Sequence, residues 1–80
     1  MRAAQKLVSD PANLRTDSHA GSINIHRLVS AAESTAGVEI KGTRNKPFYK
    51  FADGSGLTVD YVCGDYKLWP INAVTGQFVP

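Results

Sequence analysis

The clearest pattern in the first half of the chain is a helical spacing of apolar side chains. The i, i+3, i+4, i+7 spacing typical of an amphipathic helix occurs at Ile25, Leu28, Val29 and Ala32. Gly37 stands where a left-handed residue commonly ends a helix. The pattern therefore predicts a helix over residues 22–36, with one face available to pack against a sheet.

From residue 37 onward the apolar period changes from that of a helix to that of a strand. Apolar residues alternate with polar ones in three runs: Val38 and Ile40, then Tyr49 and Phe51, then Leu57, Val59, Tyr61 and Cys63. Short Gly-containing segments separate these runs, so neighbouring strands are expected to be antiparallel. Residues 66–69 predict a fourth strand, and residues 71–79 predict a last hairpin around Thr75 and Gly76.

The N-terminal residues favour a short helix. Apolar groups that fall on one side of such a helix are Ala3, Ala4, Leu7 and Val8. Pro11 disfavours helical geometry at Asp10 and ends this helix, although the same two residues can start a further turn through Leu14. Because residues 16–22 are small and polar, we expect residues 1–21 to form a short helix followed by a loop.

Eighty residues are enough for one small domain, so a single domain over residues 1–80 is expected. The order of the elements predicts an α+β fold in which one main amphipathic helix packs on an antiparallel β-meander of about three to five strands. Residues 37–80 supply this sheet. The length excludes large barrels and doubly wound folds, and the moderate charge excludes a disordered chain.

The single cysteine, Cys63, cannot form a disulfide within the chain, which favours a reducing, cytoplasmic setting. The longest uninterrupted apolar stretches are too short for a signal sequence or a membrane span. We therefore expect a cytoplasmic protein with no membrane partner.

Candidate catalytic and metal-binding residues are few and widely spaced. Cys63 continues the alternation of the third strand, which favours a buried, inert thiol over a nucleophile. His19, His26 and Cys63 lack a fourth ligand at a recognisable spacing. Asp53 and Asp65 fall where turns are expected. The sequence therefore predicts no catalytic set, no metal and no cofactor.

Positive charge is concentrated in residues 41–50, which contain four of the nine basic residues and no acidic one. Phe48 and Tyr49 lie among these cations, and such a mixture can hold phosphates while rings stack on bases. The same segment also fits a solvated loop with both rings packing in the fold, or a contact with an acidic protein. Trp69, beside Pro70, is either an interface residue or part of the core. The expected partner-binding residues are Lys41, Arg44, Lys46, Lys50 and Trp69.

In size and outline, a chain with one helix, a meander and no catalytic constellation resembles the small accessory proteins of phages and mobile elements, including the anti-CRISPR inhibitors. The resemblance implies a non-enzymatic binding protein that occupies a surface of a larger protein or nucleoprotein assembly, such as a host defence complex. The alternative is a small nucleic-acid-binding module that uses the basic and aromatic segment 41–50.

Overall fold

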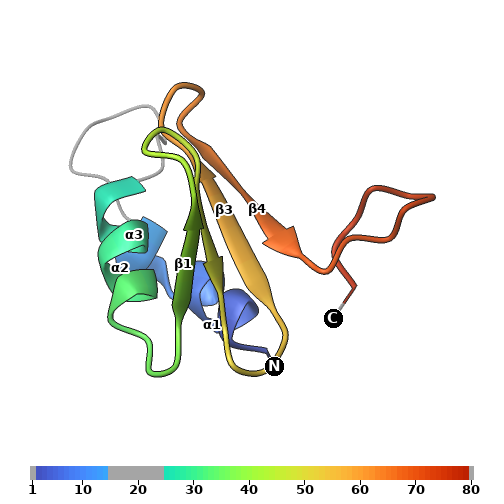
Figure 1. Cartoon of the computed structure of the whole chain (residues 1–80), viewed down its shortest axis with the longest axis horizontal. Coiled ribbons are helices and arrows are strands. Elements are labelled where there is room, and N and C mark those ends of the chain that lie inside the picture. The colour runs from blue at the N-terminus through green and yellow to red at the C-terminus, as the bar shows by residue number, and fades with distance from the viewer. Residues whose placement is uncertain (1, 15–24, 80) are drawn as a thin grey trace.

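The computed structural model describes residues 2–14 and 25–79, in which three helices precede a four-stranded sheet (Figure 1). The strands lie in the order β1-β2-β3-β4, and each pairs antiparallel with the next one along the chain. Antiparallel neighbours need only short connections, and the glycine-containing turns supply them. The α+β fold with an antiparallel meander that the sequence predicts is therefore confirmed.

The helices are α1 (Ala3–Ser9), α2 (Pro11–Leu14) and α3 (Ile25–Glu33). Asp10 separates the first two, and its Oδ1 accepts a 3.0 Å hydrogen bond from the Ala12 N–H. This carboxylate therefore supplies a partner for an amide at the start of α2. The loop expected over residues 16–22 and the expected start of the main helix lie outside the described residues.

Helix α3 ends at Glu33 rather than continuing to residue 36. The hydroxyl of Ser34 donates to the Ser30 carbonyl at 2.8 Å, and that of Thr35 donates to the Ala31 carbonyl at 3.0 Å. The Thr35 N–H bonds to the Ala32 carbonyl, three residues back, as in a tightened last turn. Two successive hydroxyl residues therefore close the helix before Gly37.

The strands are β1 (Glu39–Gly42), β2 (Pro47–Lys50), β3 (Gly56–Asp60) and β4 (Asp65–Trp69). Their register aligns Tyr49 with Leu57, and Leu57 with Leu68. Because successive side chains point to opposite faces of a strand, this register gathers one apolar face from three strands.

The third strand is shorter than the alternation predicts, because it ends at Asp60. Oδ1 of Asp60 accepts hydrogen bonds from the N–H groups of Val62 and Cys63, at 2.9 and 3.1 Å. This side chain imposes a turn on the next residues, which Gly64 completes with a φ of 72°. Tyr61 and Cys63, which we expected in the strand, are therefore exposed in the turn.

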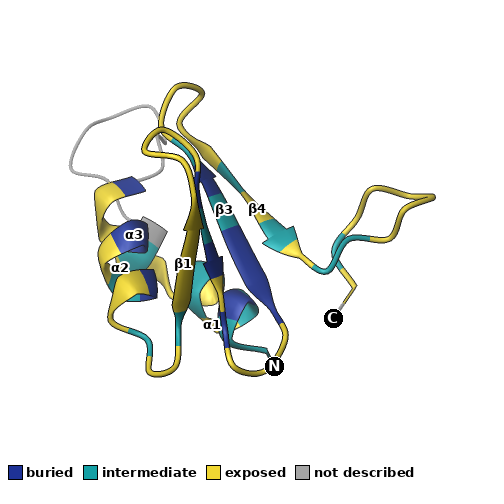
Figure 2. Cartoon of the chain, viewed as in Figure 1, coloured by how far each residue is buried: buried dark blue, intermediate teal, exposed yellow. Residues whose placement is uncertain are grey.

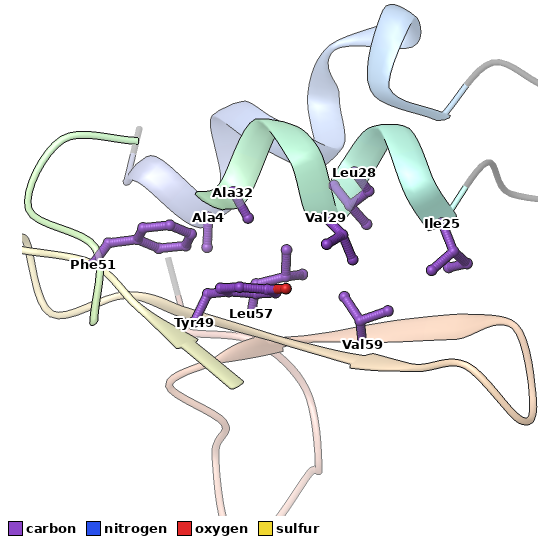
Figure 3. Close-up of a cluster of buried hydrophobic side chains, with 9 residues drawn as sticks. All are labelled: Ala4, Ile25, Leu28, Val29, Ala32, Tyr49, Phe51, Leu57 and Val59. Atoms are coloured by element: carbon purple, nitrogen blue, oxygen red, sulfur yellow. The ribbon is translucent and has the colours of Figure 1, made fainter. Parts of the chain in front are cut away.

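The core lies between the helices and one face of the sheet (Figure 3). Its buried apolar side chains are Ala4, Ile25, Leu28, Val29, Ala32, Tyr49, Phe51, Leu57 and Val59. Figure 2 shows that β3 is the most buried strand, whereas β1 at the edge is exposed along its length. The four positions that define the predicted amphipathic helix all enter this core.

The helices lie on one side of the sheet, above the strands in Figure 3. We call the opposite side the outer face. Alternation and register place on it the side chains of Glu39, Lys41, Phe48, Lys50, Thr58, Asp60, Asp65, Lys67 and Trp69, together with Gly56. No helix within the described residues covers this face.

The chain after β4 projects away from the domain (Figure 1). In place of the expected last hairpin of two strands it forms a turn with a single bridge between Ile71 and Phe78. Backbone hydrogen bonds close this turn, from Asn72 to Gln77 and from Val79 to Pro70.

Among the described helices, none is long and apolar enough to cross a membrane.

Candidate functional site

The structure brings most of the predicted binding residues to the outer face. Lys41 lies on β1, Lys50 on β2, and Trp69 at the end of β4. Lys46 reaches this face from the β1–β2 turn, where its ammonium lies 3.6 Å from the Asp60 carboxylate. Arg44 is exposed in the same turn, at the end of the sheet farther from Trp69.

The outer face carries an aromatic pair formed by Phe48 and Trp69. Their ring centroids lie 6.0 Å apart and their planes meet at 70°, an edge-to-face contact. The rings belong to β2 and β4, which both flank β3, and they approach each other above Gly56. A Cβ at position 56 would lie 3.0 Å from Cζ of Phe48 and 3.4 Å from Cβ of Trp69. Glycine therefore makes room for this pair.

The indole of Trp69 has a fixed orientation. Its Nε1–H donates a 2.8 Å hydrogen bond to Oγ1 of Thr58 on the neighbouring strand. Trp69 nevertheless remains 39% exposed, so a planar group from a partner can still reach it. A ring that is already ordered loses little conformational entropy on binding.

Phe48 packs on the outer face against Trp69, so of the two rings that were considered for packing in the fold only Tyr49 enters the core. Tyr49 and Phe51 are buried under the helices, and Phe48 is out of phase with them along the chain. It is half-buried because Trp69 lies against it. The two neighbouring rings of residues 48–49 therefore lie on opposite sides of the sheet, Phe48 on the outer face and Tyr49 in the core.

Each ring of the pair has a lysine as its neighbour along its own strand. Phe48 and Lys50 follow each other on the outer side of β2, as Lys67 and Trp69 do on β4. Within the described residues Lys50 and Lys67 form no ion pair, whereas Lys41 lies 3.1 Å from Glu39. Among the described residues, the ammonium groups of Lys50 and Lys67 are therefore not held in an ion pair, although Glu39 lies opposite Lys50 in the register.

The opposite end of the outer face is acidic. Asp60 and Asp65 stand directly opposite each other in the register of β3 and β4. Hydrogen bonds from the backbone, that of Cys63 foremost, lower the pKa of Asp60, so the carboxylate is charged at neutral pH. A pocket of about 260 Å³ lies on this face, and its walls are formed by Asp60, Asp65, Lys46, Thr58, Lys67 and Trp69.

Two residues considered for catalysis or metal binding, Cys63 and His26, lie outside the four strands that form the outer face. Cys63 is exposed, which corrects the expectation of a buried thiol, and the Asp60 carboxylate raises its pKa. His26 is exposed too, with its ring centroid 5.8 Å from that of Tyr61. His19 lies outside the described residues. Across residues 2–14 and 25–79, no three His, Cys, Asp or Glu side chains form a group that could hold a metal ion.

Sequence reasoning missed the contributions of Lys67, Thr58 and Gly56 to this face. The signal was present in the alternation of the fourth strand, since Lys67 and Trp69 are two positions apart and must share a face. Which residues of other strands join them depends on the register, and a one-residue shift would turn every side chain over.

Protein families, curated proteins and solved structures were all compared with this chain, and no match was found.

Proposed function

We propose that this protein acts by binding, without turnover, and that it contacts a larger partner through the outer face of its sheet. The single observation that carries this proposal is the Phe48–Trp69 pair, which is ordered by a hydrogen bond and by Gly56 yet is left uncovered by the helices. Tryptophan is among the residue types that most often contribute a large share of the binding energy at protein interfaces.

The charges around the pair support the same face. Lys50 and Lys67 flank the rings without an ionic partner among the described residues, so an acidic or phosphate-bearing group can pair with them. A phage-type inhibitor of a host defence complex, the class that the chain resembles in outline, would work in this way by covering a surface of that complex. We also propose that the protein acts in the cytoplasm.

The nucleic-acid-binding module remains the second candidate function. It is favoured by the alternation of ring and lysine along β2 and β4, rather than by the contiguous segment 41–50 from which it was first inferred. Within that segment Lys41 and Lys46 already pair with carboxylates of the protein.

A capture experiment tests the outer face. The tagged full chain is incubated with lysate of the cell in which it acts, with and without nuclease, beside the variants Lys50→Glu and Lys6→Glu. Lys6 is an exposed lysine of α1, in the helical layer, so Lys6→Glu carries the same charge change on the other side of the molecule. We expect Lys50→Glu to lose the captured partner and Lys6→Glu to retain it. Equal capture by the two variants would contradict the proposal, provided that both remain folded by circular dichroism.

A further inference from the structure

We propose that the ligand of the outer face is single-stranded nucleic acid, with bases stacking on the Phe48–Trp69 pair and phosphates contacting Lys50 and Lys67. This inference rests on the proposed binding role of the outer face and develops the second candidate function, because it names the partner of that face. It is carried by the arrangement of rings and cations across three strands, which the sequence alone does not show.

The aromatic pair offers what an unpaired base requires. Bases stack on aromatic side chains irrespective of sequence, because every base has a π-face. Trp69 retains 39% of its surface, and its hydrogen bond to Thr58 prevents the indole from folding away. Gly56 and Thr58 are small, so β3 presents no bulky side chain between the strands that carry the rings.

The lysines are placed where the phosphates of such a strand would lie. Lys50 and Lys67 are on β2 and β4, on either side of β3, and strands two positions apart in a sheet are about 10 Å apart. A flexible four-carbon stem lets each ammonium follow a backbone that passes over the rings. Each lysine lies beside one ring, so a nucleotide can meet a ring with its base and an ammonium with its phosphate.

The acidic end of the outer face limits where the strand can run. Asp60 and Asp65 would repel phosphates, and the ammonium of Lys46 already lies 3.6 Å from the Asp60 carboxylate. The strand therefore crosses the sheet over Phe48 and Trp69 and avoids the β3–β4 turn. The aspartate pair therefore lies at the end of the outer face away from Lys50.

The same features favour a single strand over the other partners considered. In a duplex the base faces are stacked on one another, so the rings would have nothing to stack on. An acidic protein would use the lysines but would not require two ordered rings between them. An unpaired strand can use both at once, with its bases on the rings and its phosphates on the lysines.

Fluorescence of the chain's only tryptophan gives a direct measurement, because that tryptophan is Trp69. The full-length protein is titrated at low salt with single-stranded oligonucleotides of about twelve thymidines or uridines, and with a DNA duplex of matched length. Anisotropy of a labelled oligonucleotide measures binding independently of the quenching. We expect quenching of Trp69 by the single strands and binding of the duplex at least tenfold weaker.

Variants separate the rings from the charges. Phe48→Leu keeps an apolar side chain against Trp69 but removes the ring, and we expect affinity to fall about tenfold. Lys50→Ala and Lys67→Ala should each reduce the slope of log affinity against log salt by about 0.7, since each removes one phosphate contact. Lys6→Ala, on the helical layer, is the matched control and should change neither the affinity nor the slope by a comparable amount.

Three results would overturn the inference: no binding of either oligonucleotide at low salt, a duplex that binds as tightly as the single strands, or binding that Phe48→Leu and the two lysine variants leave unchanged. The capture experiment then shows whether the proposed role of the outer face is refuted as well. If Lys50→Glu loses a protein partner that resists nuclease, only the proposal of a nucleic-acid ligand is refuted. If Lys50→Glu captures every partner that Lys6→Glu captures, the proposed role of the outer face is also refuted.

Discussion

The backbone N–H of Ala3 donates a 2.6 Å hydrogen bond to Oδ2 of Asp53, across 50 positions of sequence. The next amide, that of Ala4, donates to Oγ of Ser55 at 3.1 Å, and Oδ1 of Asp53 accepts the Ser55 hydroxyl at 2.6 Å. The first amides of a helix have no partner within it, and Arg2 at the N-cap offers no side-chain bond. The β2–β3 turn therefore caps α1 and holds it on the sheet.

Removal of the Ser55 hydroxyl should destabilise the domain. Ser55 is fully buried, so Ser55→Ala leaves the Ala4 N–H without its acceptor, at a cost of about 1–3 kcal/mol in the free energy of unfolding. Urea denaturation followed by circular dichroism measures this loss. Ser34→Ala is the control, since its hydroxyl also bonds to the backbone but is exposed. Equal losses in the two variants would show that the buried α1 cap contributes no more than the exposed hydroxyl bond of Ser34.

The same cap should make stability depend on pH in the acid range. Hydrogen bonds from the Ser55 hydroxyl and then the Ala3 amide lower the pKa of Asp53 from 3.8 to about 2. The folded state thus binds this proton less readily than the unfolded state, so the stabilisation is present above the unfolded pKa and is lost as the pH falls toward 2. Thermal unfolding should therefore find Asp53→Asn less stable than wild type at neutral pH, with the difference closing in acid. A difference that stays constant down to pH 2 would contradict this assignment.

A methyl group at position 56 should disturb the aromatic pair. Its Cβ would lie 3.0 Å from Cζ of Phe48 and 3.2 Å from the Tyr49 carbonyl oxygen, so the ring must move. We expect Gly56→Ala to cost about 1–3 kcal/mol and to change the near-ultraviolet circular dichroism of Trp69. In a Phe48→Ala background the same substitution should cost less, because the ring it meets is gone. Identical costs in both backgrounds would mean that the ring is not what Gly56 accommodates.

The exposed thiol of Cys63 should react in the folded protein, but slowly. The carboxylate of Asp60 raises the pKa of Cys63, so less reactive thiolate is present at neutral pH than in an isolated cysteine. Labelling with a neutral pyridyl disulfide should therefore be faster in Asp60→Asn, whose amide oxygen can still accept the turn's hydrogen bonds. A thiol that reacts only after unfolding, or a rate unchanged in Asp60→Asn, would refute this account.

The layered architecture could be inferred from the sequence because it depends on local periodicity. The spacing of Ile25, Leu28 and Val29 specifies one buried stripe, and burial of apolar area then orients the helix toward the sheet. The alternation that buries Tyr49 and Leu57 works in the same way, since a strand with one apolar face has one favourable orientation. These patterns act over a few residues, so no knowledge of distant parts of the chain was required.

The composition of the outer face was decided by the tertiary structure. Phe48 and Trp69 meet because the register of β3 places Gly56 between them, and no local pattern encodes that register. The basic segment 41–50, a single cluster in sequence, is divided in the fold because Lys41 pairs with Glu39 and Lys46 with Asp60. Charge acts through space and decays with distance rather than with sequence separation, so only the folded sheet determines which lysines remain available beside the rings.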